Sequence, residues 1–156
     1  SKYKNMENFL NKLSVVLTTL WVGGLWSMLM VTSVLFHKIP SAYIAGAIAE
    51  DMFMYINYFG IITALFLIFI GFKKSGIKLL KKSYFWIIFI MLGVIMINYF
   101  GINPFLEALK IEALSKEVME SVFSERYRTW HGIASAAYLF ECFLGIMLVL
   151  RVKSLD

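Results

Sequence analysis

Four long apolar stretches constrain what this chain can fold into more than any other feature of its sequence. They cover residues 13–36, 52–72, 83–106 and 129–150, and Glu141 is the one acid among them. Each is long enough to cross a bilayer as a helix, which takes about 20 residues. Strands would leave backbone groups unpaired in lipid. We therefore predict an all-α, up-down four-helix bundle that forms a single transmembrane domain over residues 1–156.

The composition excludes a water-soluble monomer. Hydrophobic residues make up 60% of the chain and charged residues 16%, whereas soluble domains are about half apolar and a quarter charged. The net charge of +5 comes from short loops, so we expect the lipid bilayer as a partner and no nucleic acid. The lone Cys142 excludes an intrachain disulfide. The sequence carries no hydrolase, metalloprotease or nucleotide-binding motif, so no catalytic residue is predicted.

Lysine and arginine are distributed unevenly between the two sides of the predicted bundle. The side that holds both termini and the loop between the second and third stretches carries ten of them, and the opposite side carries five. Positive residues accumulate on the cytoplasmic side of membrane proteins. We therefore predict a multi-pass protein of a bacterial inner membrane with both termini in the cytoplasm.

The connection between the third and fourth stretches has a helical pattern of its own. Asn103 suits a helix N-cap and Pro104 the first helical position, so a new helix is expected to begin there. Ser115 is positioned to cap a second short helix. We predict an amphipathic segment over residues 107–128 that lies on the outer membrane surface.

Glu141 is the polar residue that stands out most inside the stretches. It lies about 18 Å from the outer end of its helix, near the middle of the bilayer, where a carboxyl group by default marks a functional site. Ser27 is expected at a matching depth on the first helix. Two interpretations stay open. Glu141 is either a structural acid that bonds Ser27, bonds a backbone carbonyl or faces a partner subunit, or a group that handles protons or ions.

Small residues predict where helices approach each other. Gly23 and Ser27 are four residues apart, as are Gly132 and Ala136, and this spacing lets transmembrane helices pack closely. Together with Gly24, these residues favour helix–helix association. We therefore expect a homo-oligomer or an assembly with other membrane subunits.

A six-residue repeat, INYFGI, occurs at residues 56–61 and again at residues 97–102. The two copies run in opposite directions through the membrane, so Asn57 and Asn98 are expected at the same depth. We predict a hydrogen bond between them, which is either a structural contact between the second and third helices or a paired polar site.

Further candidate residues lie toward the outer side of the predicted bundle. His37 and His131 end and begin their helices, and two imidazoles on facing helices can hold haem iron, while thioethers with imidazole suit copper(I). No cofactor is predicted outright, but haem b or copper stays open against ordinary interfacial and packing roles. Arg126 and Arg128 are candidates for binding an anion, or they extend to lipid headgroups. The methionines of this group are Met28, Met30, Met52 and Met54.

The sequence resembles a family of small membrane proteins, the bacterial domain of unknown function 4149, which is related to the eukaryotic transmembrane protein 205-like proteins. The resemblance implies four transmembrane helices without an assigned activity. The association of the eukaryotic relatives with resistance to a platinum drug implies a role near soft metals or export. Glu141 departs from the apolar residue that the family would place there. The matching positions are residues 20–26, 35–36, 45–48, 53, 103–104, 126, 131–135 and 138–139.

These observations order the expected functions. The first is a non-enzymatic structural or accessory bundle that forms assemblies. The alternative is a haem- or copper-binding membrane protein that uses His37 and His131. The third is a small proton-coupled transporter that uses Glu141, Asn57 and Asn98.

Overall fold

The computed structural model describes residues 1–105, 107–108 and 120–152, with only the backbone at 42, 43, 120–125, 127 and 128. Its main helices are α1 (Lys2–Lys38), α2 (Ala42–Ser75), α3 (Ser83–Ile97) and α5 (Glu120–Val152). A 3-10 helix, η1 (Gly76–Lys81), joins α2 to α3, and one π-helical turn, η2 (Asn98–Ile102), follows α3. The chain is therefore all-α, as predicted.

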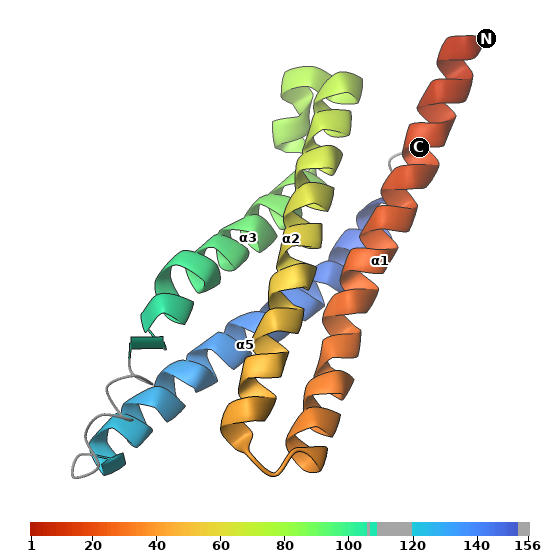
Figure 1. The fold of residues 1–156 in the computed structure, drawn as a ribbon. Coiled ribbons are helices and arrows are strands. Elements are labelled where there is room, and N and C mark those ends of the chain that lie inside the picture. Colours follow the sequence, from red (N-terminus) through yellow and green to blue (C-terminus); the bar gives the residue numbers. More distant parts are fainter. Residues whose placement is uncertain (106, 109–119, 153–156) are drawn as a thin grey trace.

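The four main helices alternate in direction and pack as a bundle (Figure 1). α1 contacts α2 and α5, and α3 contacts the same two helices. The start of α1, the end of α2 with η1, and the end of α5 point toward one end of the molecule, whereas the turn between α1 and α2 lies at the other. This is the up-down order that short connections between antiparallel helices produce.

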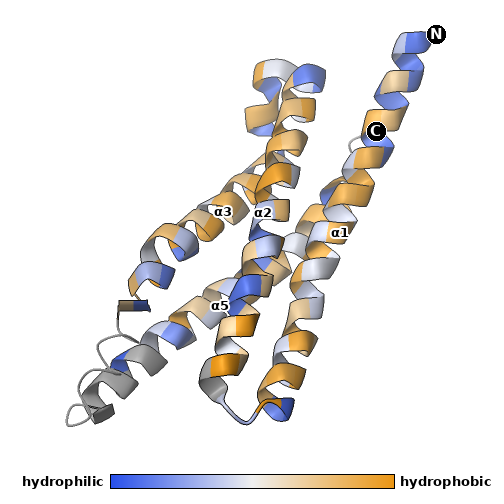
Figure 2. Ribbon diagram, in the orientation of Figure 1, coloured by the Kyte–Doolittle hydropathy of each residue, from blue (hydrophilic) through white to orange (hydrophobic). Residues whose placement is uncertain are grey.

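Four segments are long and apolar enough to cross a membrane, namely Lys2–Lys38, Ile44–Lys81, Ser83–Phe105 and Thr129–Val152. Only 28–33% of the most apolar part of each is buried inside the chain, and hydrophobic residues, in orange, make up much of the length of the four main helices in Figure 2. A water-exposed surface of this kind would be unstable. The arrangement indicates a multi-pass membrane protein with the lipid bilayer around it.

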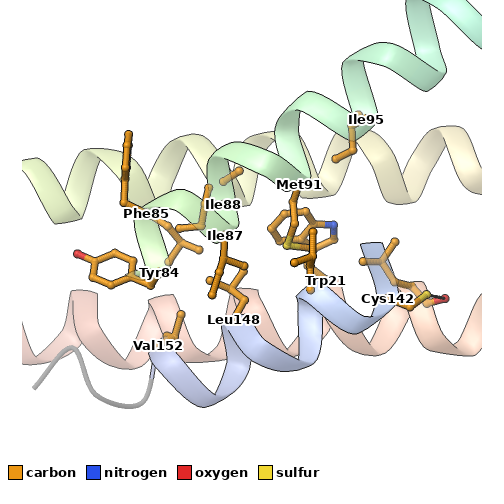
Figure 3. Packing of buried hydrophobic residues seen from close by; sticks show 14 of the residues in the cluster. Trp21, Tyr84, Phe85, Ile87, Ile88, Met91, Ile95, Cys142, Leu148 and Val152 are labelled. Atoms are coloured by element: carbon orange, nitrogen blue, oxygen red, sulfur yellow. Dashed lines mark hydrogen bonds between the residues drawn. The ribbon is translucent and has the colours of Figure 1, made fainter. Parts of the chain in front are cut away.

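The core lies between the four helices, with residues from α1, α2, α3 and α5. Figure 3 shows the indole of Trp21 next to Met91 of α3 in this cluster. Trp21, Leu25, Ile88, Met91, Cys142 and Leu148 are all fully buried. Large side chains from several helices therefore fix how the helices pack.

The helices extend beyond the apolar stretches that predict them. α1 already begins at Lys2, where Ser1 Oγ accepts a hydrogen bond from the Lys4 N–H (3.4 Å). α2 begins at Ala42, where Ser41 Oγ accepts from the Ile44 N–H (3.3 Å). A capping side chain stabilises a first helical turn even when that turn is polar. The apolar run in the sequence therefore marks the part of the helix that crosses the membrane, and the helix itself extends further.

The prediction that a new helix starts at Asn103 is wrong. Asn103 has helical angles (φ −62°, ψ −46°), and its N–H bonds the Asn98 carbonyl in the wide turn of η2. The helical segment thus continues to Phe105 through Pro104. Proline cannot donate to the carbonyl one turn earlier, and a π turn is a common way for a helix to absorb such an irregularity.

The predicted amphipathic segment, residues 107–128, is described only in part. Residues 109–119, including the expected cap Ser115, lie outside the described residues. From Glu120 onward the backbone belongs to α5 and runs without a break into the fourth span. The last part of this segment is therefore an extension of the membrane-crossing helix.

Candidate functional site

Glu141 lies on the inner face of α5 and is 1% exposed. Its Oε1 atom has no hydrogen-bond partner among the described residues. The expected partner Ser27 is exposed, and its hydroxyl donates to the Gly24 carbonyl of its own helix (3.0 Å). The structure therefore does not bring Ser27 and Glu141 together. A serine within a helix readily bonds the carbonyl of the preceding turn, which satisfies Ser27 without a contact to α5.

Other buried polar atoms accompany Glu141 in the bundle. Trp21 Nε1 on α1 and Thr63 Oγ1 on α2 are also without a hydrogen-bond partner in the described part of the chain, and both residues are 0% exposed. Buried polar groups are normally paired, so these atoms are the clearest candidates for a polar function. Neither Thr63 nor Trp21 stands out from the apolar run around it. The sequence therefore does not predict a buried polar role for either residue.

Side chains of α1 and α5 hold the helix turn that carries Glu141 in place. Trp26 Nε1 donates to the Cys142 carbonyl (3.0 Å), and the Tyr138 hydroxyl donates to the Leu25 carbonyl. Cys142 Sγ also lies 3.8 Å from the Leu25 carbonyl oxygen. These contacts join two helices by hydrogen bonds to backbone carbonyls, so the position of Glu141 relative to α1 is well defined.

Glycines of a different set from the predicted one create the close contacts inside the bundle. A Cβ atom on Gly60 would overlap the Trp21 indole, and one on Gly145 would lie 3.0 Å from Val22 Cγ1. A Cβ on Gly24 would make an ordinary contact of 3.7 Å with Ile56. Among the described residues, no atom lies within 4 Å of a Cβ on Gly23 or Gly132. Of the three predicted packing glycines, Gly24 is therefore the one whose Cβ would contact another helix in the described part of the chain.

The two copies of the repeat meet, but through their tyrosines. The Tyr58 and Tyr99 hydroxyls lie 3.0 Å apart, with ring centroids 6.1 Å apart. Asn98 Oδ1 is buried without a hydrogen-bond partner among the described residues, so the predicted bond from Asn57 to that atom is not formed. The third residues of the two copies pair, and not the second residues, so tyrosine hydroxyls take the place of the predicted asparagine amides.

The residues singled out for haem or copper differ widely in exposure. Met28 is 1% exposed and Met30 is 70% exposed, so they lie on different faces of α1. Met52 and Met54 are half-buried on α2, and His37 and His131 are both exposed. Among the described residues, no group of three or more His, Cys, Asp or Glu side chains is arranged to hold a metal.

The two arginines stand on the outer part of α5. Arg126 is exposed, and the side chain of Arg128 lies outside what the structure describes. The anion site at this pair stays a prediction.

Comparison with known proteins identifies one matching family model. The model of the family described as Domain of unknown function (DUF4149) matches residues 16–115. This range contains α1 from its second third onward, α2, η1, α3 and η2. No curated protein and no solved structure matches the chain.

Proposed function

The chain belongs to the DUF4149 family, and from that premise we propose that it is a non-enzymatic membrane protein, an accessory bundle that associates with further copies of itself or with other membrane subunits. The observation that carries the proposal is that the small-residue stripes face outward. Gly23, Ser27, Gly132 and Ala136 are all exposed. Because no described atom lies within 4 Å of a Cβ at Gly23 or Gly132, packing within the described part of the chain does not require a glycine at either position.

The face of α1 around Gly23 is shaped to receive another helix. It borders a shallow apolar groove of about 290 Å³ between α1 and α5, lined by Thr19, Val22 and Gly23 from α1 and by residues of α5 such as Ile146. Along the same face of α1, Leu20 is 59% exposed and Met30 70% exposed. Small residues between larger apolar ones let helices approach closely enough to gain van der Waals contact in lipid.

A bulky substitution on this face tests the proposal. We expect Gly23→Leu to reduce the size of the assembly in mild detergent, because the side chain would fill the space that a partner helix needs. Gly93→Leu on α3 is the matched control, since nothing lies within 4 Å of a Cβ there either. The measurement is mass determination by light scattering with the detergent contribution subtracted.

Two results would contradict the proposal. A wild-type chain that is monomeric in detergent and in lipid nanodiscs has no assembly to disrupt. Equal size changes in Gly23→Leu and Gly93→Leu would show that any added apolar bulk has the same effect. In either case the small-residue face on α1 is not a contact.

The proposal includes an orientation and a place. We propose a bacterial inner membrane, with both termini and the η1 loop in the cytoplasm, on the strength of the lysines at that end of the bundle. Residues 107–128 then lie toward the outer surface, and the whole chain forms one domain. A cysteine at exposed Lys78 should react with a membrane-impermeant maleimide only after the cells are opened. Labelling of intact, sealed cells would reverse the orientation.

A second candidate function rests on Glu141, the handling of protons or ions by a small transporter. A carboxyl group at 1% exposure in the middle of a membrane-spanning helix is costly and by default marks a functional position. Thr63 and Trp21 add further buried polar atoms without partners in the described residues. Transporters commonly bind substrate at broken helices. The third span is widened by the π turn η2 but stays helical up to Phe105, so assembly remains the first function.

A further inference from the structure

A second site, separate from the Glu141 core, opens at the end of the bundle where α1 begins and α2 ends. A groove of about 530 Å³ lies there between the first turns of α1, the last turns of α2 and the start of α3. Figure 2 shows hydrophilic residues, in blue, on this end of both α1 and α2. We propose that the groove binds the phosphate headgroup of an anionic glycerophospholipid, with its acyl chains extending along the apolar lining.

The charge of the groove favours an anion. Lys73, Lys74 and Lys82 line it, and Glu7 is the acidic residue of the lining. Lys74 Nζ donates to Asn11 Oδ1 across the groove, which fixes one ammonium group between α2 and α1. Basic pockets between transmembrane helices on the cytoplasmic side are a known arrangement for anionic headgroups.

The start of α3 adds donors to these lysines. α3 begins at Ser83 without a side-chain cap on its first turn, and the residues on either side, Lys82 and Tyr84, both line the groove. The first N–H groups of a helix have no partner within the helix and carry partial positive charge. A phosphate at this turn receives backbone hydrogen bonds in addition to the ammonium groups.

The apolar part of the lining decides between a lipid and a free anion. Met6 and Leu10 of α1 and Ile70 of α2 face the same groove as the lysines. Toward the middle of the bundle these helices are membrane-spanning segments. Ile70 lies one turn deeper in the bundle than Lys73 and Lys74, whereas Met6 and Leu10 lie beside the lysines. A groove that combines lysines with apolar side chains at the end of membrane-spanning helices matches a molecule that has a phosphate at one end and hydrocarbon at the other, whereas a free phosphate would use only the lysines.

The experiment compares two double substitutions of equal charge. Lys73→Gln with Lys82→Gln removes two ammonium groups from the groove, and Lys78→Gln with Lys81→Gln removes two from η1, which does not line it. The probe is phosphatidylglycerol added to delipidated protein in detergent, with bound lipid counted by native mass spectrometry. Because a lysine near the membrane surface changes affinity by roughly fivefold, we expect the groove variant to lose at least about tenfold and the η1 variant to lose much less.

Further arms separate the sources of the signal. The double variant Lys73→Arg with Lys82→Arg should retain binding of phosphatidylglycerol, because arginine keeps both positive charges. Phosphatidylcholine should bind more weakly than phosphatidylglycerol, and glycerol 3-phosphate alone should not compete at similar concentration. Equal losses in the groove and η1 variants, or equal binding of both lipids, would overturn the proposal. Full competition by glycerol 3-phosphate would make the ligand a soluble phosphate.

Discussion

Glu141 is the residue at which the assembly and transport functions differ. In a purely structural bundle, the carboxyl group of Glu141 needs only hydrogen-bond partners. In a proton-handling bundle, the same group must bind and release a proton. The structure buries it at 1% exposure with one oxygen unpaired among the described residues. The burial also removes one predicted alternative, an acid that faces a partner subunit across the lipid.

Replacement by glutamine tests the transport function at this residue. Glutamine keeps the shape of the side chain but cannot exchange a proton, so we expect Glu141→Gln to abolish pH-driven flux in liposomes loaded with a pH-sensitive dye. Asp51→Asn, at an exposed acid of α2, is the control and should retain the wild-type rate. Flux that is unaltered in Glu141→Gln, or absent from the wild type, would reject transport through Glu141.

Sequence alone located Glu141 but not its surroundings. One acid in an apolar run is visible without a structure, and so is its depth. Its neighbours are not, because α1 and α5 are apolar over most of their circumference and carry no amphipathic pattern that marks the inner face. Depth in the membrane alone predicts Ser27 as a partner of Glu141, but Ser27 lies on the exposed face of α1.

At the scale of the helices, the contact between α1 and α2 depends on Gly60. The Trp21 indole lies against this glycine so closely that a Cβ atom would overlap it, and Trp21 has no exposed surface along which to move. The same position in the second copy of the repeat is Gly101, where nothing lies within 4 Å of a Cβ.

The two glycines give a matched pair of substitutions. We expect Gly60→Ala to lower the free energy of unfolding by about 1–3 kcal/mol, the usual cost of overpacking a core. Gly101→Ala should be neutral or should stabilise by up to about 1 kcal/mol through helix propensity. The measurement is thermal unfolding in detergent followed by tryptophan fluorescence. Similar losses for both variants would mean that helix geometry, and not the Trp21 contact, decides the effect.

The sequence predicted the number, type and order of the helices, because apolar length in a membrane leaves few alternatives. It did not predict the π turn at Asn98–Ile102. Asn103 and Pro104 look like the start of a helix, but the same residues are tolerated inside one when the turn before them widens. The repeat likewise predicted that α2 and η2 meet, while the pairing of Tyr58 with Tyr99 in place of the asparagines depends on how the two helices are rotated.

At the scale of the whole molecule, the bundle buries about a third of each span and leaves the rest to its surroundings. Most of that surface is large and apolar, which lipid covers at no cost. The small residues of α1 and α5 differ from these large apolar residues. A glycine on a lipid-facing surface lowers the helix propensity, and a Cβ at Gly23 or Gly132 would contact no described atom within 4 Å. A partner helix that packs against this surface would explain the small residues, because they let two helices approach closely.

Cysteine cross-linking at Gly23 in native membranes tests this central claim most directly. Cys142 is fully buried, so the wild-type chain serves as the background that is not expected to cross-link, and Gly93→Cys, at a half-buried position of α3, is the control. We predict that oxidation converts Gly23→Cys, and not Gly93→Cys, to a covalent dimer. No dimer from Gly23→Cys, together with free reaction of its thiol with a lipid-soluble maleimide, would contradict self-association through this face.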